Sequence, residues 1–268
     1  MRKEQVDILI LSRNRSHSLF QTVASIREFT KWPYRIIIQD HASDQNHKIH
    51  IRRLKAPDCE TYFLDKFLSC NEGRRFGLKF VHSQYVAFID DDVRVGKDWL
   101  FEMMRVMHCR PDAAAVTSNV LHDKGRKESG VRNHKSGMIR REPWGYVGQG
   151  IACLGGATLY RTDALHRTSF SSKFNGGFED WDQTLQLTQE QGYTIWGSNA
   201  GMIHLHQQDS VGNYSLDRWR WVEVMDAAIE VYRKWGILEG MRTTMQASLA
   251  RNVRLRPEQW DAVKAAGL

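Results

Sequence analysis

The sequence has few cysteines and no long apolar run, and each shortage excludes a class of protein. Its four cysteines, scattered over 268 residues, do not form the dense disulfide framework of a small secreted domain. No segment approaches the roughly 18 uninterrupted apolar residues of a membrane-spanning helix, and the run at residues 8–11 is too short for the core of a signal peptide. The sequence therefore predicts a globular, cytoplasmic protein with reduced thiols.

Positive charge, by contrast, is in excess. The formal net charge is +7, which suits a nucleic acid, an anionic membrane surface or a phosphorylated substrate, and charge alone does not choose among them. Many basic residues gather in the segment 122–141, namely Lys124, Arg126, Lys127, Arg132, Lys135, Arg140 and Arg141. This segment is either solvated surface or an anion-binding loop.

Short apolar segments alternate with helical patterns along the chain. Residues 6–11, 35–39 and 85–89 have the unbroken apolar character of buried parallel strands, and residues 18–29 and 71–82 have helical patterns. This order is typical of a doubly wound α/β sheet, in which the carboxyl ends of the strands line a nucleotide crevice. Further on, residues 99–108 predict a helix, and residues 113–120 and 151–161 predict strands. Residues 121–150 lack periodicity, which predicts a long functional loop.

Three adjacent carboxylates stand where one apolar run ends, in the segment Phe88-Ile-Asp-Asp-Asp-Val93. Since side chains alternate along an extended segment, Asp90 and Asp92 point to one side and Asp91 to the other. Two carboxylates that face one crevice repel each other unless a cation joins them, and oxygen ligands suit Mg²⁺ or Mn²⁺. The triplet is alternatively a cap for the helix that begins near Asp98. The buried strand in front of it favours a site for a metal-bound phosphate.

A second acidic cluster follows a pair of glycines, in the segment Phe174-Asn-Gly-Gly-Phe-Glu-Asp-Trp-Asp182. Glycines permit an unusual backbone and the close approach of a substrate, and acids at the start of a helix are favoured by its dipole. A capping role would explain one of the three acids and not all of them. If this turn faces the same crevice as Asp92, Asp180 can take a proton from a hydroxyl nucleophile as a general base.

Two histidines close the last segment with strand character, which runs from Thr194 to His204 and His206. Two positions apart on an extended segment, they face the same side, and neutral imidazole is a good ligand for Mn²⁺. A structural role is the alternative for each histidine. A zinc site made from both has no supporting cysteine or HExxH spacing.

Together these clusters resemble the motifs of the family 2 glycosyltransferases over about residues 6–206. The matching segments are Ser12-Arg-Asn14, Ile36-Ile-Ile-Gln-Asp-His-Ala-Ser-Asp44, Asn71-Glu-Gly73, Phe88-Ile-Asp-Asp-Asp92, Gly155-Gly-Ala-Thr-Leu-Tyr-Arg161, Glu179-Asp-Trp-Asp182 and His204. Each motif is weak alone, whereas their order and spacing are fairly specific. Gln39 and His41 depart from the family's usual acid and glycine, which leaves the nucleobase open.

The resemblance implies a GT-A fold, an α/β architecture with a Rossmann-like mixed, mainly parallel sheet flanked by helices. It implies a catalytic domain at residues 1–214, with a nucleotide-binding half (1–92) and an acceptor and metal half (93–214), followed by a helical C-terminal extension (215–268). The implied donor contacts are Ser12, Arg13, Asn14, Asp40, Asp44, Asn71, Asp90 and Asp91. The implied metal ligands are Asp92 with His204 or His206, the implied catalytic base is Asp180, and the implied acceptor contacts are Gly155, Gly156, Glu179 and Trp181.

The chemistry that the resemblance implies is an inverting sugar transfer. The donor is a nucleotide-diphosphate sugar, expected to be a UDP-sugar, the acceptor is a hydroxyl of a glycan or a lipid-linked molecule, and Mn²⁺ or Mg²⁺ neutralises the leaving diphosphate. The basic segment 122–141 would close over the diphosphate or meet an anionic acceptor.

A nucleotidyltransferase or nucleotide-sugar pyrophosphorylase is an alternative function, but it would usually have an early glycine-rich loop where this chain has Ser12-Arg-Asn-Arg15. A nucleic-acid-binding protein is a third, for which no compact basic and aromatic stripe stands out, so no nucleic-acid partner is expected.

Residues 216–267 carry helical signals. Trp219, Val222, Met225 and Ile229 recur at near-helical spacing, and a last helical turn follows Pro257. Packing onto the catalytic domain or dimerisation explains this stripe more readily than a cofactor site. The alternative is a peripheral contact with the inner face of the membrane, made by Arg218, Arg220, Arg233 and Trp235, for an enzyme with a lipid-linked acceptor.

Overall fold

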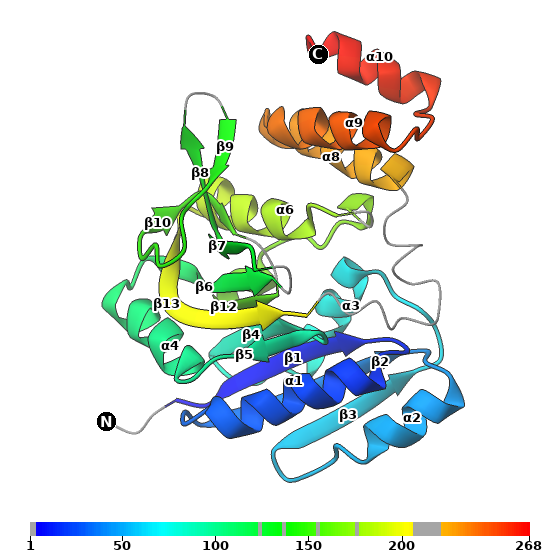
Figure 1. Cartoon of the computed structure of the whole chain (residues 1–268). Helices are drawn as coiled ribbons and strands as arrows, with labels where there is room; N and C mark the ends of the chain where they lie inside the picture. Colours follow the sequence, from blue (N-terminus) through cyan, green and yellow to red (C-terminus); the bar gives the residue numbers. More distant parts are fainter. Residues whose placement is uncertain (1–3, 123–124, 136–137, 154–155, 175–176, 206–220) are drawn as a thin grey trace.

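Figure 1 shows the computed structural model of the chain, which describes residues 4–122, 125–135, 138–153, 156–174, 177–205 and 221–268. This part of the chain forms a ten-stranded mixed sheet and a separate three-stranded one. The large sheet has the strand order β10-β13-β6-β12-β4-β1-β2-β3, with β5 and β7 paired to β13 and β6. The expected α/β architecture, a mixed sheet flanked by helices with a helical C-terminal region, is confirmed.

Four parallel strands make up the first half of the sheet. They are β1 (Val6–Ser12), β2 (Tyr34–His41), β3 (Cys59–Leu64) and β4 (Tyr85–Asp90). The helices between them are α1 (Ser16–Phe29), α2 (Gln45–Arg52) and α3 (Cys70–Gly77). Strand β1 is almost entirely buried because helices cover both faces of the sheet, which explains its unbroken apolar sequence.

Two elements of this half were missing from the sequence-based prediction, and one helix is shorter than expected. Helix α2 buries only Ile51, and its other apolar residue, Ile49, is exposed, so the helix has no buried apolar face. Strand β3 lies at the edge of the sheet and is mostly half-buried. The helix expected at residues 71–82 ends at Gly77 and is followed by a 3₁₀ turn, Leu78–Phe80. Elements that bury little surface leave weak periodicity in the sequence.

The second half of the chain adds strands of both directions to the large sheet, with β13 parallel to β6 and the other pairings antiparallel, and it forms a small second sheet. Its strands are β5 (Val93–Val95), β6 (Ala113–His122), β7 (Lys127–Ser129), β8 (Val131–Lys135), β9 (Met138–Arg141), β10 (Gln149–Gly150), β11 (Ala152–Cys153), β12 (Ala157–Arg161) and β13 (Thr194–His204). Its helices are α4 (Trp99–Cys109), α5 (Thr162–His166) and α6 (Glu179–Leu185), which continues as a π-helical turn, Gln186–Glu190. Strand β12 pairs antiparallel with both β4 and β6.

The prediction of a long loop at residues 121–150 is wrong, because this segment contains the strands β7 to β10. These strands have two to five residues each and are rich in charged and polar side chains. Strands β8, β9 and β11 form the separate small sheet. Likewise, the single strand expected at residues 151–161 is divided between the two sheets as β11 and β12.

The C-terminal helices pack against the rest of the molecule. They are α8 (Trp221–Trp235), α9 (Glu239–Ala250) and α10 (Pro257–Ala265), and Figure 1 shows them stacked over α6. Ala227 and Val231 of α8 share an apolar cluster with Leu185 of α6. The fully buried carboxylate of Asp182 accepts hydrogen bonds from the Lys234 ammonium at 2.8 Å and the Trp235 indole at 2.9 Å. Helix α8 is therefore held to α6 by both apolar and charged contacts.

The predicted membrane contact is only partly covered by the described residues. Arg218 and Arg220, like Trp219 of the helical stripe, lie outside them. Trp235 is turned inward onto Asp182, so a membrane contact would have to rest on Arg233 and its neighbours; it stays a prediction. Among the described helices, none combines the length and the apolar character that a membrane span requires.

The four cysteines are free thiols and differ in accessibility, which predicts a simple labelling pattern. Cys59 and Cys153 are buried, and burial raises the pKa of their thiols to about 11 and about 12. Since the thiolate is the reactive species, both should resist an aromatic disulfide reagent in the native protein, while the exposed Cys109 should react first. Mass spectrometry of the labelled protein checks this; rapid modification of Cys153 without unfolding would contradict the structure.

Candidate active site

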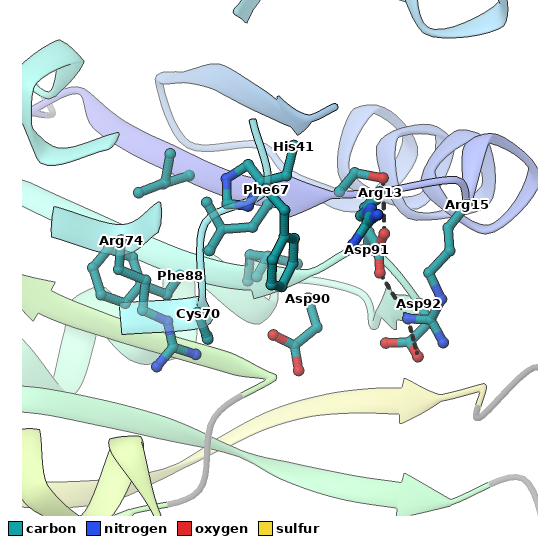
Figure 2. A pocket seen from close by; sticks show the side chains of 14 residues that line it. Arg13, Arg15, His41, Phe67, Cys70, Arg74, Phe88, Asp90, Asp91 and Asp92 are labelled. Carbon is teal, nitrogen blue, oxygen red and sulfur yellow. Dashed lines mark hydrogen bonds and ion pairs between the residues drawn. The ribbon is translucent and has the colours of Figure 1, made fainter. Parts of the chain in front are cut away.

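The carboxyl ends of β1, β2 and β4 meet at one edge of the sheet and border a pocket (Figure 2). Its wall consists of Leu9, Leu11, Ser12, Arg13, Arg15, His41, Phe67, Cys70, Arg74, Phe88, Ile89 and residues 90–92. Five predicted site residues, Ser12, Arg13, Asp90, Asp91 and Asp92, thus come together here. Parallel strands place their carboxyl ends side by side, which is why residues almost 80 positions apart share one site.

The acidic triplet begins at the last residue of β4, Asp90, and continues as a turn at residues 91–92 rather than as the expected extended segment. Asp91 turns toward the first loop, where it accepts hydrogen bonds from the Ser12 hydroxyl at 2.8 Å and from Arg15 at 2.9 Å. Arg15 also reaches Asp92, with 3.0 Å between Nη1 and Oδ2. Burial raises the pKa of Asp91, and Arg15 opposes this effect. Arg15 therefore links two of the three acids and offsets part of their mutual repulsion.

Asp90 and Asp92 face His204, and the three residues can each offer one ligand atom, all within 4.8 Å of one another. Strand β13 brings the histidine there because His204 pairs in register with Val93, next to the triplet. His204 Nε2 lies 3.1 Å from Asp92 Oδ1. Carboxylate oxygens with an imidazole nitrogen form a donor set that suits Mn²⁺. His206, the alternative ligand, lies outside the described residues.

The far end of the pocket combines two aromatic rings, Phe67 and His41, with the Arg13 guanidinium. The Arg13 guanidinium lies 4.7 Å from the centre of the Phe67 ring, and the His41 ring meets Phe67 edge-on at 6.4 Å. His41 Nδ1 is 3.0 Å from the Leu68 carbonyl and its Nε2 is 2.7 Å from the Gln39 amide nitrogen, which assigns the proton to Nδ1. Burial lowers the pKa of His41, so the ring is neutral at pH 7.

The need for glycine at position 73 of the Asn71-Glu-Gly73 segment is explained by the neighbouring His41 ring. A Cβ on Gly73 would lie 2.3 Å from His41 Cε1, closer than real side chains approach. Asn71 itself turns away from the pocket, and its amide donates to the Ser171 carbonyl at 2.9 Å. The segment therefore makes room for the His41 ring and ties α3 to the chain in front of α6. Its predicted direct contact with the donor stays a prediction.

Three further predicted donor contacts, Asn14, Asp40 and Asp44, form hydrogen bonds within and between the loops that follow β1 and β2. Asn14, with a left-handed φ of 53°, accepts the Asp44 N–H at 2.8 Å, and its own N–H donates to Ser43 at 2.8 Å. Asp40 is fully buried and accepts hydrogen bonds from the hydroxyl and N–H of Ser43. None of these three side chains is among the residues that line the pocket. Contact of Asn14, Asp40 and Asp44 with a donor stays a prediction.

The predicted base, Asp180, lies in the first turn of α6 and is paired with a buried arginine of α3. Arg74 Nη1 lies 2.5 Å from Asp180 Oδ1, and the guanidinium also lies 5.3 Å from the centre of the Phe88 ring. Arg74 is part of the wall of the strand-end pocket. The Arg74–Asp180 ion pair therefore connects that pocket to α6.

Asp180 also lies on the wall of a second cavity of about 480 Å³, which extends up to the C-terminal helices. The wall consists of Arg132, Ile139, Arg141, Gly177, Phe178, Asp180, Trp181, Trp221, Val224, Glu239, Thr243, Thr244 and Ala247. These residues come from the β8–β9 hairpin, α6 with the residues before it, α8 and α9. The Phe178 and Trp181 rings meet edge-on at 5.3 Å. The predicted acceptor residue Trp181 thus faces a real cavity, which we call the second cavity.

The remaining predicted acceptor residues lie near these two spaces. Gly156 has a φ of 106°, and a Cβ there would lie 2.8 Å from Met202 Cε and 3.7 Å from Asp90 Oδ2. Its carbonyl accepts the Asp90 N–H at 3.0 Å, which aligns the acidic strand end. Glu179 is buried in the first turn of α6. Gly155 lies outside the described residues. Acceptor contact by any of these residues stays a prediction.

The match to a family model decides the identity. Residues 7–168 match the model of the glycosyl transferase family 2. The chain belongs to this family. It is therefore a glycosyltransferase, as the resemblance of its motifs implied, and the matched region contains the strand-end pocket and the acidic triplet. No curated protein sequence matches the chain.

Solved structures show that this family 2 glycosyltransferase has the GT-A fold. Staphylococcus aureus TarS in complex with UDP-GlcNAc has a TM-score of 0.64 at 14% identity, over 96% of this chain and 79% of that one. The Pyrobaculum calidifontis mannosyltransferase PcManGT with GDP-Man and Mn²⁺ has a TM-score of 0.62 at 13% identity, over 99% and 79%. GalNAc-T7 with UDP, GalNAc and Mn²⁺ has a TM-score of 0.62 at 13% identity, and this chain spans 59% of its length.

Two arginines of this glycosyltransferase site escaped the sequence-based prediction. Arg15 stands directly after the predicted Ser12-Arg-Asn14 segment, and Arg74 directly after Asn71-Glu-Gly73. Both are adjacent to predicted motifs, so extending each motif by one residue would have included them. Their partners, Asp92 and Asp180, are 77 and 106 positions away in the chain. Nothing in the sequence pairs them.

Proposed function

We propose that this glycosyltransferase moves a sugar from a nucleoside diphosphate donor to an acceptor hydroxyl with inversion at the anomeric carbon. The observation that carries the proposal is the place of Asp180. Its carboxylate lies on the wall of the second cavity and is paired with Arg74 of the strand-end pocket. A base placed between a donor pocket and an acceptor cavity can deprotonate the attacking hydroxyl while the sugar is still bound to its leaving group.

The strand-end pocket is proposed as the donor site. Its aromatic end, with Phe67 and the neutral His41, suits a nucleobase, and Arg13 and Arg15 provide positive charge toward the diphosphate. The donor is proposed to be a UDP-sugar. This choice is supported by the structures of TarS with UDP-GlcNAc and GalNAc-T7 with UDP, while PcManGT binds GDP-Man.

Asp90, Asp92 and His204 are the proposed holders of Mn²⁺, with Mg²⁺ as the alternative ion. When bound, such an ion neutralises the negative charge that develops on the leaving diphosphate. Side chains of the protein would position these groups and accept the proton. Arg15 holds Asp92 in place, Arg74 holds Asp180, and Asp180 accepts the proton of the acceptor hydroxyl. The acceptor is proposed to be a glycan or a lipid-linked molecule that enters the second cavity.

Calorimetry tests the donor site directly. UDP, GDP, CDP and dTDP are titrated into the protein with Mn²⁺ and, separately, with EDTA. We expect one diphosphate to bind, and we expect EDTA or Asp92→Ala to weaken that binding by at least about tenfold because the metal would lose a ligand.

The matched control is Asp163→Ala, which removes an exposed carboxylate that is paired only across the surface with Arg167. This variant should bind the diphosphate as the unaltered protein does. Binding of a diphosphate that is equally tight in EDTA would exclude a metal-dependent donor site, and failure of all four to bind would count against the strand-end pocket as the donor site.

A further inference from the structure

We propose that the second cavity takes an acceptor sugar that carries an anionic group, a phosphate or a carboxylate, and that Arg132 and Arg141 bind this group. The inference rests on the proposed function in one respect, the use of this cavity for the acceptor. What it adds is the chemical class of the acceptor.

Positive charge is concentrated around one buried carboxylate beside the cavity. Glu128 of β7 lies 3.3 Å from Arg126, 3.2 Å from Arg132 and 3.1 Å from Arg141, measured from each guanidinium nitrogen to the nearest carboxylate oxygen. Its fourth partner is His122, at 2.7 Å. One carboxylate cannot balance three guanidinium groups. Among the described ion pairs, this cluster, residues 122, 126, 128, 132 and 141, therefore keeps an excess of positive charge even with a neutral histidine. A second buried carboxylate, Glu142, follows Arg141 in the chain and still leaves three guanidinium groups against two carboxylates.

Two of the three arginines of this cluster form the cavity wall. The Arg132 side chain is only 3% exposed, and burial lowers its pKa to about 10, with further lowering by Arg141 and Arg126. Arg141 is 57% exposed, so its guanidinium is accessible to solvent. Arg132 Nη1 already donates to the carbonyls of Ser129 and Val131, at 2.8 Å each. An anion bound between the two arginines would therefore reduce the repulsion among the guanidinium groups and accept charge-assisted hydrogen bonds chiefly from Arg141.

The two carboxylates of the cavity wall do not cancel this charge. Asp180 is already paired with Arg74, which approaches from the donor pocket. Glu239 lies in the first turn of α9, and among the described residues it forms no ion pair with Arg132 or Arg141, which both pair with Glu128. The positive excess therefore remains at the β8–β9 side of the cavity.

The cavity also suits the body of a sugar. Phe178, Trp181 and Trp221 are part of its wall, and aromatic rings pack against the apolar C–H faces of a pyranose. A ligand with one such face and one anionic group would match both the aromatic and the basic residues of the wall. The donor diphosphate is a poor candidate for the arginines, because the donor pocket has arginines of its own in Arg13, Arg15 and Arg74.

The test is a comparison of three probes, glucose 6-phosphate, glucuronic acid and glucose, by ligand-observed NMR in low salt. Saturating UDP and Mn²⁺ are present so that the donor pocket is filled. We expect at least one of the two anions to bind about tenfold more tightly than glucose, and Arg141→Gln to abolish that preference. The rank of the phosphate against the carboxylate then identifies which anion the cavity takes.

The control is Arg167→Gln, which removes a similarly exposed arginine whose carboxylate partner is Asp163, away from both pockets. This variant should keep the preference for the anion. Equal binding of glucose and both anions, absence of saturable anion binding, or a preference that survives Arg141→Gln would each overturn the inference.

UDP titrations on the same variants separate this inference from the proposed function. If Arg141→Gln leaves the affinity for UDP unchanged and removes anion binding, the arginines belong to the acceptor cavity. If instead UDP binding falls about tenfold in Arg141→Gln, they serve the donor diphosphate and the inference is wrong, while the donor site stands.

Discussion

Replacement of Asp180 by asparagine should lower kcat for sugar transfer by about 10²–10⁴-fold, the usual contribution of a general base. Asparagine has the shape of aspartate and cannot accept a proton from the attacking hydroxyl. The KM for the donor should change little, because Asp180 does not line the donor pocket. Calorimetry names the nucleotide, and the measurement is then the steady-state release of that nucleoside diphosphate from a matching sugar donor found by screening, with water or a glycan as acceptor.

Two controls separate chemistry from folding in this variant. The asparagine side-chain oxygen can still accept the hydrogen bond from Arg74, so Asp180→Asn should remain folded, at a cost of about 1–3 kcal/mol for the lost charge partner. Thermal unfolding and UDP binding verify this. Asp163→Asn, an exposed carboxylate outside both pockets, should retain full activity. Normal turnover by Asp180→Asn would show that another group is the base.

The largest loss of stability is expected from Asp7→Ala, at the start of β1. The fully buried Asp7 carboxylate accepts hydrogen bonds from Arg35 at 2.9 and 3.0 Å, and from the backbone N–H groups of His82 and Ser83 at 2.7 and 3.0 Å. Its removal would leave a guanidinium and two N–H groups without their acceptor. We expect a decrease of about 3–5 kcal/mol in the free energy of unfolding, measured by urea denaturation.

Glu60→Ala is the matched control, because Glu60 is a second, half-exposed carboxylate on the same Arg35 at 3.3 Å. An exposed pair of this kind should contribute less than about 1 kcal/mol. Equal losses in the free energy of unfolding for Asp7→Ala and Glu60→Ala would show that the burial of Asp7 does not cause the large effect.

The stabilisation by Asp7 should also depend on pH. Burial raises its pKa, but the hydrogen bonds from Arg35, His82 and Ser83 outweigh burial and hold the pKa below its ordinary value. A carboxylate with a lowered folded-state pKa stabilises the protein fully above its unfolded value of about 3.9 and loses this contribution as the pH falls through the folded value. The stability difference between the unaltered protein and Asp7→Asn should therefore shrink in acid.

The sequence was most informative where a feature depends on neighbouring residues alone. The apolar runs of β1, β2 and β4 are recognisable because both faces of these strands are buried. The expectation that Asp90 and Asp92 share a side is met at His204, although residues 91–92 form a turn and not the extended segment on which that expectation rested. Helix α2 and the strands β7 to β10 were missed because they are short or polar and bury too little surface to impose a pattern.

By itself, then, the sequence determined the α/β order of the elements, the acidic strand end with its histidine, and membership of the glycosyltransferase family. Only the tertiary structure decided the pairings between residues far apart in the chain, such as Arg74 with Asp180 across 106 positions. The C-terminal helices, for which the sequence predicted packing or dimerisation with a membrane contact as the alternative, form one wall of the second cavity. The physical reason is that alternation and burial leave a local pattern, whereas ion pairs and cavities depend on how distant segments are brought together.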